Sequence, residues 1–254
     1  MTASRFIVKM DPNSYANCEE ILTKSTHLAW KVDFESKRII GSATHTMVAI
    51  SDCQKITLDS SKLSISGISV DGTDVKWDLD PADIKYGSRL NIYKAIEAGS
   101  LIKIEIRYST SPDASAIQWL DASQTVGKKF PYVFTQCQAI HARSVLPCQD
   151  TPGVKVTVTA AVTVPAGMRA LMSAMDDISK NSEDNFNFNQ PICIPSYLIA
   201  LAVGNIEGIR VGPRTTVWSE PESVKAAAWE FAETELFIST AESLLTPYIW
   251  VIYA

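Results

Sequence analysis

Strict alternation of apolar and polar side chains in short stretches constrains the fold of this chain more than any other feature. In the stretch HLAWKVDFE, residues 27–35, the large apolar side chains of Leu28, Trp30, Val32 and Phe34 occupy every second position, and the charged Lys31 and Asp33 lie on the other side. A period of two is the geometry of a strand that buries one face and exposes the other. This stretch therefore predicts a half-buried strand.

The same alternation returns in further stretches, separated by turn-forming residues: RIIGSATHTMVAI, KLSISGISV, DVKWDLD, LIKIEIRYS and VKVTVTAAVTVP. Asp71 and Gly72, which follow the second of these, are typical of a two-residue hairpin turn. Many closely spaced strands without intervening helices favour an antiparallel β domain of sandwich or saddle type. A hydrophobic fraction of 46% with 20% charged residues supports a soluble domain with a sizeable core.

The pattern changes toward the end of the sequence. The run CIPSYLIALAVGNIEGIRVG, residues 193–212, predicts a strand buried on both faces. Ser219 and Glu222 then have the spacing of a capping box, and a helix is predicted from about Pro221 to Leu245. Its apolar residues recur at helical spacing, so we expect this stripe to pack against another element. The stripe consists of Val224, Ala228, Phe231, Ile238, Ala241 and Leu245.

Charge and composition exclude several classes of partner and site. The net charge of -5, without a block of like charge, gives nucleic acid or anionic lipid no basic surface to bind. No run approaches the roughly 18 apolar residues of a membrane span, and the first residues lack a signal-peptide pattern, so we expect a cytoplasmic protein. The five widely spaced cysteines favour free thiols. With only three histidines, His27, His45 and His141, a histidine-rich metal site is not expected.

The segment FTQCQAIHARSVLPCQDTPGVK, residues 134–155, gathers most of the chemically interesting side chains. One interpretation makes Cys137 a nucleophile and His141 its base, but four residues of strand would separate them by about 13 Å. The other interpretation places Cys137, Ile140 and Cys148 in the core. Arg143 and Asp150 are then an internal ion pair or a turn contact around Pro147 and Pro152. Neither explains Gln136 and Gln138, whose amides would share one strand face.

Several motifs resemble the leukotriene A(4) hydrolase/aminopeptidase branch of the zinc aminopeptidases. They include DPNSYANCEEILTKSTHLAWKVDFESKRIIGSA, AIQWLDASQT, the QCQAIHARSVLPCQDTPGVK segment, PSYLIALAVGNIE and VGPRTTVWSE. The resemblance extends over nearly the whole chain. It implies a saddle-like β domain over residues 1–208, followed at 209–254 by the first strand and helix of a truncated thermolysin-like catalytic domain.

The same resemblance implies a role for one segment. In the family, the Q-C-Q segment reaches into the active-site cleft and helps to hold the amino-terminal end of a peptide from which one residue is hydrolysed. Carried over to this sequence, the substrate-binding residues are Gln136, Cys137, Gln138 and Ala139. Amides on a rigid element suit this role, because they fix a free amino terminus without competing for the metal.

The sequence departs from the family in its catalytic motif. Zinc chemistry there uses H-E-x-x-H, but none of the three histidines is followed by glutamate, and after ESLLTPYIW the chain reads VIYA. We therefore expect no catalytic or metal-binding residue and no cofactor in this chain, although zinc serves the full-length family. The leading hypothesis is a non-catalytic, substrate-anchoring portion of an aminopeptidase, inactive alone, which meets peptide N-termini in the full-length context.

Two alternatives stay open. The chain could be a free-standing module that binds peptides or proteins without hydrolysis, or an independent enzyme that uses Cys137 or Asp150. We further expect the C-terminal helix, if uncovered, to promote association, because an exposed apolar stripe is costly in water.

Overall fold

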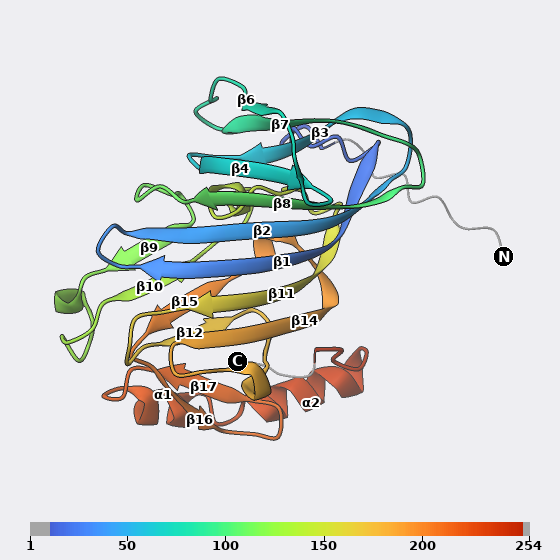
Figure 1. The fold of residues 1–254 in the computed structure, drawn as a ribbon. Coiled ribbons are helices and arrows are strands. Elements are labelled where there is room, and N and C mark those ends of the chain that lie inside the picture. Colours follow the sequence, from blue (N-terminus) through green and yellow to red (C-terminus); the bar gives the residue numbers. More distant parts are fainter. Residues whose placement is uncertain (1–10, 251–254) are drawn as a thin grey trace.

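The computed structural model describes residues 11–250. A long curved sheet dominates it, with a small sheet above and a layer of helices below in the view of Figure 1. The order in the large sheet is β13-β14-β11-β1-β2-β8-β4-β5. Its strands are β1 (Ile21–Asp33), β2 (Arg38–Ala49), β4 (Ser64–Val70), β5 (Thr73–Asp74), β8 (Leu101–Ser109), β11 (Lys155–Thr163), β13 (Met175–Asp176) and β14 (Asn185–Pro195).

Burial along β1 confirms the alternation seen in the sequence. Leu28, Trp30 and Val32 are at most 2% exposed, whereas Lys31 between them faces solvent. Burying a side chain of this kind contributes about 1.5–3 kcal/mol. The predicted turn is also present, since Asp71 and Gly72 both have positive φ angles (50° and 79°), as a type I′ turn requires.

One pair of central strands is not antiparallel, contrary to the predicted pattern. β1 and β11 run parallel, with Leu28 opposite Ala160 and Trp30 opposite Val162. The long stretch of chain between them permits this, because parallel neighbours need a crossover rather than a tight turn. Residues 136–154 connect β10 to β11 and therefore lead into this parallel pair.

Two smaller sheets complete the β domain. One has the order β3-β7-β6 and the other β12-β15-β10-β9. The prediction of one strand buried on both faces over residues 193–212 is wrong. That run contains the end of β14, a 3-10 turn and two short strands, because the chain leaves the large sheet after Pro195 and joins a smaller one. The strands are β3 (Cys53–Ser60), β6 (Trp77–Leu79), β7 (Ser88–Ile96), β9 (Ile117–Leu120), β10 (Tyr132–Thr135), β12 (Arg169–Met172) and β15 (Leu201–Gly204). The 3-10 helices are η1 (Ala122–Gln124), η2 (Ala142–Ser144), η3 (Ile178–Lys180) and η4 (Ser196–Leu198).

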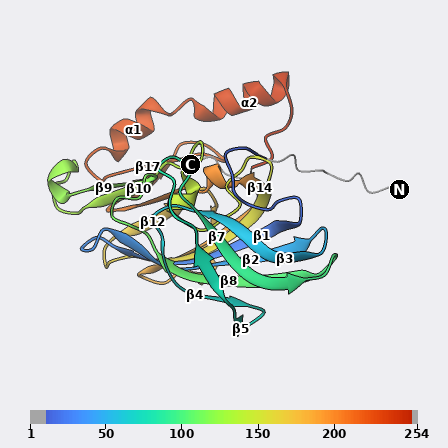
Figure 2. The same cartoon turned by 90° about the horizontal axis from the view of Figure 1, so that it is seen from above.

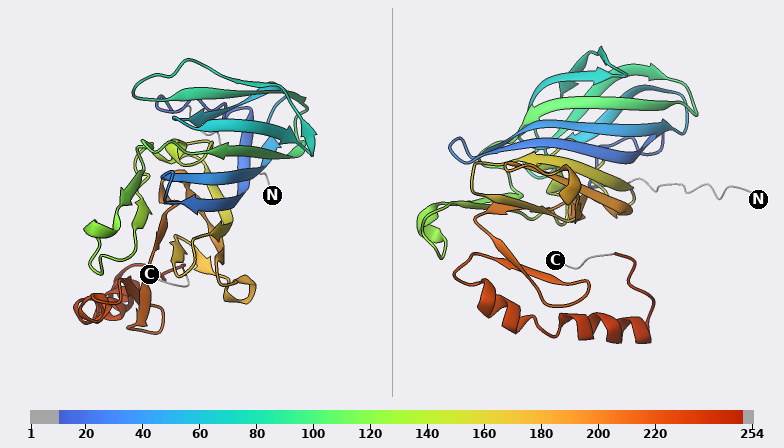
Figure 3. Two further views of the ribbon diagram at one scale, coloured as in Figure 1. Left: turned by 60° about the vertical axis from the view of Figure 1, so that its left-hand side comes forward. Right: turned by 60° about the horizontal axis from the view of Figure 1, so that its bottom comes forward.

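The last described part is a hairpin followed by two helices, which lie apart from the large sheet in Figures 2 and 3. The elements are β16 (Glu207–Arg210), β17 (Thr216–Ser219), α1 (Val224–Glu230) and α2 (Thr234–Leu244). The single predicted helix is therefore broken at residues 231–233. The amide and hydroxyl of Thr234 both donate to the Phe231 carbonyl (3.1 and 2.8 Å), which a continuous helix would bond to Glu235.

The predicted capping box at Ser219 and Glu222 does not form. Ser223 precedes the first residue of α1, and its hydroxyl instead contacts that of Ser219 at 2.8 Å. Between residues 11 and 250, no helix is long and apolar enough to cross a lipid bilayer.

The hairpin is joined to the β domain by polar and aromatic contacts. The Glu220 carboxylate accepts hydrogen bonds from the amides of Val126 (2.9 Å) and Gly127 (3.3 Å). The Arg169 guanidinium of β12 lies 4.6 Å from the centre of the Trp218 ring. The α2 helix is held to the hairpin loop by Arg214, which pairs with Glu235 and Glu242 at 2.8–2.9 Å.

Candidate functional site

Residues 136–141 form an exposed turn that follows strand β10. The strand ends at Thr135, so the expectation of two glutamines on one strand face is wrong; Gln136 and Gln138 lie in the turn instead. The peptide bond between Gln138 and Ala139 is cis. Gln136, Gln138 and Ala139 are all exposed, whereas Cys137 between them is buried.

Main-chain and side-chain hydrogen bonds define the shape of this turn. The Gln136 amide donates to the Ala116 carbonyl (2.8 Å), and the His141 amide donates to the Cys137 carbonyl (2.8 Å). The Gln138 amide donates to Oε1 of the Gln136 side chain at 3.2 Å. Gln136 therefore uses its acceptor within the turn, so the two glutamines are not equivalent.

The Gln138 carboxamide is the polar group that the turn leaves available. Within residues 11–250 it forms no hydrogen bond, and the side chain is exposed. A primary amide offers two donors and one acceptor with two lone pairs. It could contact both the carbonyl and the amine of a short extended chain.

Cys137 does not have the surroundings of a nucleophile. Its side chain is 2% exposed, and burial together with the nearby Asp150 carboxylate raises the pKa of its thiol to about 12. Within residues 11–250 the His141 ring forms no hydrogen bond with this thiol, and its Nδ1 pairs with the Ser115 hydroxyl at 2.8 Å. A reactive cysteine needs a lowered pKa and access to solvent, so the burial of Cys137 does not favour its interpretation as a nucleophile. Cys137 could contact a ligand only through its main chain.

A buried ionic cluster lies directly behind the turn, as the interpretation of Arg143 and Asp150 as an internal ion pair predicted. Arg143 Nε donates to Asp150 Oδ2 at 2.9 Å, and Asp59 Oδ1 lies 3.7 Å from Arg143 Nη1. Burial raises the pKa of Asp59 even though Arg143 opposes this effect. Asp150 is fully buried and also accepts from Ser196 (2.6 Å), which leaves it inaccessible to a substrate. The cluster is structural.

The core assignments made from the sequence are confirmed for two cysteines. Cys137 and Cys148 are buried, while Ile140 is only half-buried because it ends the exposed turn. All five cysteines are free thiols, and Cys193 is the exposed one.

The histidines of this chain do not fit a zinc site. His45 is buried, with Nδ1 against the Thr26 hydroxyl and Nε2 against the Pro147 carbonyl. His27 pairs with Thr159 on another strand, and His141 with Ser115. Among the residues that the structure describes, no group of three or more His, Cys, Asp or Glu side chains could hold a metal ion. The three imidazoles are committed to local partners on separate elements.

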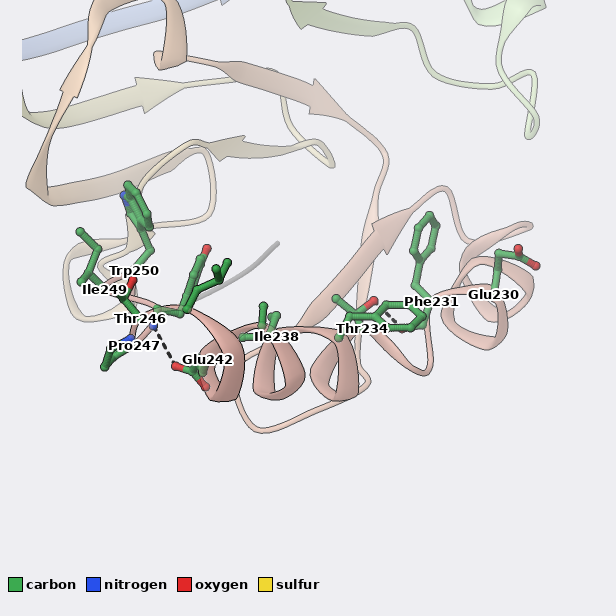
Figure 4. Close-up of a pocket in the computed structure, with 13 residues that line it drawn as sticks. Glu230, Phe231, Thr234, Ile238, Glu242, Thr246, Pro247, Ile249 and Trp250 are labelled. Atoms are coloured by element: carbon green, nitrogen blue, oxygen red, sulfur yellow. Dashed lines mark hydrogen bonds between the residues drawn. The ribbon is translucent and has the colours of Figure 1, made fainter.

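A second feature is an apolar groove of about 670 Å³ between α2 and residues 245–250. Figure 4 shows Thr234, Ile238 and Glu242 along the helix, with Pro247, Ile249 and Trp250 beyond the end that carries Glu242. The amide of Tyr248 donates to Glu242 at 2.9 Å and closes one end. The expected packing of the helical stripe is found only at its start, where Val224 of α1 is buried, because no residue of α2 is buried.

Comparison with known proteins identifies relatives for most of these residues. Residues 11–198 match the family described as the peptidase M1 N-terminal domain. The chain is 44% identical over 248 residues to leukotriene A-4 hydrolase of Xenopus laevis, and 37% identical over 251 residues to leucine aminopeptidase 2 of Aspergillus terreus. Both alignments cover 94% of this chain, but it spans only 41% and 40% of the lengths of these relatives.

Solved structures agree with this assignment. Native yeast LTA4 hydrolase superimposes with a TM-score of 0.91 at 34% identity, over 96% of this chain and 38% of that protein. An M1 zinc metallopeptidase from Deinococcus radiodurans, solved with Tyr-Ser-Ala as bound substrate, gives a TM-score of 0.69 over 92% of this chain and 56% of that protein. Its identity is 18%, so this likeness concerns the fold alone.

The fold and the sequence thus point to one family, as the resemblance of the motifs implied. The mainly β architecture with several antiparallel sheets matches that of the yeast LTA4 hydrolase N-terminal region. The chain therefore belongs to the M1 peptidase family, with relatives among the leukotriene A4 hydrolases and leucine aminopeptidases.

Proposed function

We propose that this chain supplies the substrate-anchoring part of a zinc aminopeptidase of the leukotriene A4 hydrolase type. Within it, the turn of residues 136–139 binds the amino-terminal end of a peptide. The observation that carries the proposal is the exposed Gln138 carboxamide, which has no partner among residues 11–250 although the turn below it is tightly bonded. An exopeptidase site needs such fixed polar groups to select a chain end.

The four residues of the turn have different roles in this proposal. Gln138 contacts the peptide, and Ala139 offers its backbone beside it. Gln136 fixes the conformation of the turn, because its side-chain oxygen accepts a hydrogen bond from the Gln138 amide. Cys137 anchors the turn in the core, because its side chain is buried.

Peptides are the substrate class we propose, because relatives carry aminopeptidase names and one distant M1 structure holds Tyr-Ser-Ala. The hydrolytic step itself is not assigned to residues of this chain, since its histidines do not fit a zinc site. We expect the 254-residue protein alone to hold no stoichiometric zinc and to cleave no aminoacyl reporter. One equivalent of tightly bound zinc together with turnover, in a preparation free of host aminopeptidases, would contradict this. The five free thiols favour a reducing, cytoplasmic location.

We further propose two units in the chain. The division predicted between residues 208 and 209 falls inside β16, whose four residues pair with β17. Because a paired hairpin belongs to one unit, we place the division at Asn205–Ile206. The second unit, with the hairpin, α1 and α2, is the start of a catalytic domain, and the exposed face of α2 is where association would occur.

The experiment that tests the anchoring role uses a fusion in which this chain replaces the matching 41% of Xenopus leukotriene A-4 hydrolase. Gln138→Ala should lower kcat/KM for a tripeptide. The decrease should correspond to a loss of about one to three kcal/mol in transition-state stabilisation, the range for a lost hydrogen bond that involves a charged group. Gln54→Ala, at an exposed position on β3, is the matched control and should leave the kinetics unchanged. Equal kinetics for both variants would remove Gln138 from the site.

The second candidate function is a free-standing module that binds peptides or proteins without hydrolysis. The continuous core of the β domain, which includes strands from β1 to β15, is the observation that favours it. Under this hypothesis the chain alone would bind peptides that have a free amino terminus, whereas a fusion to a catalytic part would add nothing to affinity.

A further inference from the structure

Two residues outside the Q-C-Q segment hold the anchoring turn in place. Ser115 and Ala116 lie directly before β9, about 20 residues or more ahead of the turn in the sequence, yet both ends of the turn bond to them. The Gln136 amide donates to the Ala116 carbonyl at 2.8 Å, which fixes the entry. The Ser115 hydroxyl and His141 Nδ1 are 2.8 Å apart, which fixes the exit.

Ser144 closes the network from the core side. Its hydroxyl donates to the His141 carbonyl (2.8 Å) and accepts from the Ala116 amide (3.1 Å). Ser144 is 1% exposed, so this part of the network lies in the core with the buried cluster of Arg143. Ala116 thus joins the entry of the turn to its exit.

The Ser115–His141 contact differs from the Ser144 contacts because both of its residues are exposed. An exposed hydrogen bond contributes little to global stability, since water replaces it when it breaks. Its effect is local: it restrains the ring at the exit of a turn whose tip carries Gln138. A binding group must be held to within about 0.5 Å of its productive position to be useful.

We infer that Ser115 and His141 are positioning residues for the anchoring turn. They act on the ligand through Gln138, without touching the ligand, and the inference rests on the proposed function of that turn. The hydroxyl and Nδ1 form the exposed half of a clamp, and Ser144 forms the buried half. Losing the exposed half loosens the tip of the turn while the fold stays intact.

The test uses the 254-residue chain and NMR relaxation of the backbone amides of residues 136–141. In the native protein these amides should have order parameters near 0.85. Ser115→Ala should lower those of Gln138 and Ile140 below about 0.6, the range of flexible backbone. Ser115→Thr keeps the hydroxyl and should restore the order. Ser51→Ala, at an exposed serine whose side chain forms no hydrogen bond among residues 11–250, is the control.

A second variant and a binding measurement complete the design. His141→Phe keeps a ring but removes Nδ1, and should reproduce the effect of Ser115→Ala with an unchanged melting temperature. In a titration with Tyr-Ser-Ala, both variants should bind about three- to tenfold more weakly than the native chain, the range that one lost hydrogen bond implies. A turn that is as ordered in both variants as in the native chain would overturn the clamp. If instead Gln138→Ala leaves peptide binding unchanged while Ser115→Ala loosens the turn, the clamp stands and the anchoring role of Gln138 fails.

Discussion

The large sheet and helix α2 both carry apolar side chains, but the sheet buries them and the helix exposes them. On β1, β2 and β8 the apolar face is almost completely buried, with Leu28, Met47 and Ile104 at 0% exposure. On α2, Leu236, Phe237 and Leu244 are 59–76% exposed. The strands find partners within the chain, whereas the helix is tied to its hairpin by Arg214 and two glutamates. Apolar periodicity therefore indicates which face needs cover, but burial depends on a partner being present.

The largest expected effect concerns hydrogen exchange in these two regions. We expect amides of β11 (Lys155–Thr163) to exchange only on global unfolding and those of α2 by local opening, a difference of at least about 5 kcal/mol in opening free energy. Exchange followed by mass spectrometry measures it. Truncation before Glu220 should leave the β domain folded and more soluble. Equal protection of α2 in a monomer would show that the helix has a docking surface.

Next in size are substitutions of one arginine in each region. Arg143→Met removes the cation of a buried cluster and leaves Asp59 and Asp150 without it. The free energy of unfolding should therefore fall by about 3–5 kcal/mol. Arg214→Met, at a side chain 27% exposed, should lower the free energy of unfolding by no more than about 1 kcal/mol. Urea denaturation followed by tryptophan fluorescence compares them. Similar losses in both variants would contradict the contrast between a buried and a solvated network.

The third expectation is a pH dependence confined to the β domain. Burial lowers the pKa of His45 to about 4, below its ordinary value of 6.5, so the unfolded chain binds this proton more tightly than the folded one. The stabilisation is complete above pH 6.5 and is lost as the pH falls toward 4, by about 3 kcal/mol in total. Asp59, whose pKa is raised above its ordinary value of 3.8, acts in the opposite sense as the pH falls through its raised pKa toward 3.8.

Urea midpoints between pH 7.5 and 4.5 measure this slope. His45→Gln cannot take up a proton and should flatten the slope, whatever its effect on stability at neutral pH. A slope that is unchanged in His45→Gln would assign the pH dependence to other groups.

The smallest expected effect concerns the exposed face of α2. Phe237→Ala should change the free energy of unfolding by no more than about 0.5 kcal/mol, because the ring is already 65% exposed. The matched control is Phe188→Ala on β14, where the ring is 3% exposed and about 3–5 kcal/mol should be lost. A loss above 1 kcal/mol at Phe237 would mean that the α2 face is covered in solution.

Most of the strands could be predicted because their signal is local. Alternation over a few residues identified β1, β2, β4, β8 and β11, and Asp71–Gly72 identified the turn between β4 and β5. The break between α1 and α2 was missed, because it depends on Thr234 competing for the Phe231 carbonyl, which helical periodicity does not register. The end of β10 at Thr135 was missed for a similar reason, since Gln136 has no local signal that ends a strand.

The candidate site divides along the same line. The motif that contains Gln136 and Gln138 was visible in the sequence by resemblance, and the Arg143–Asp150 pair by spacing. Ser115 and Ala116 were not, because each meets the turn across about 20 to 26 residues of chain and carries no pattern of its own. Ser144 was also missed, although it lies only three residues after His141. The different roles of the Gln136 and Gln138 side chains could not be predicted from the sequence either, because they arise from one hydrogen bond inside the turn.

The amino-acid sequence by itself determined the mainly β class, the buried faces of the central strands and the absence of an H-E-x-x-H motif, because periodicity and residue type are local properties. Only the tertiary structure decided that β11 lies parallel to β1, that Cys137 is buried in the core and that the Gln138 carboxamide has no hydrogen-bond partner among residues 11–250. Each of these depends on which distant segments meet. Chain crossover, burial and hydrogen-bond partners are set by packing over the whole domain.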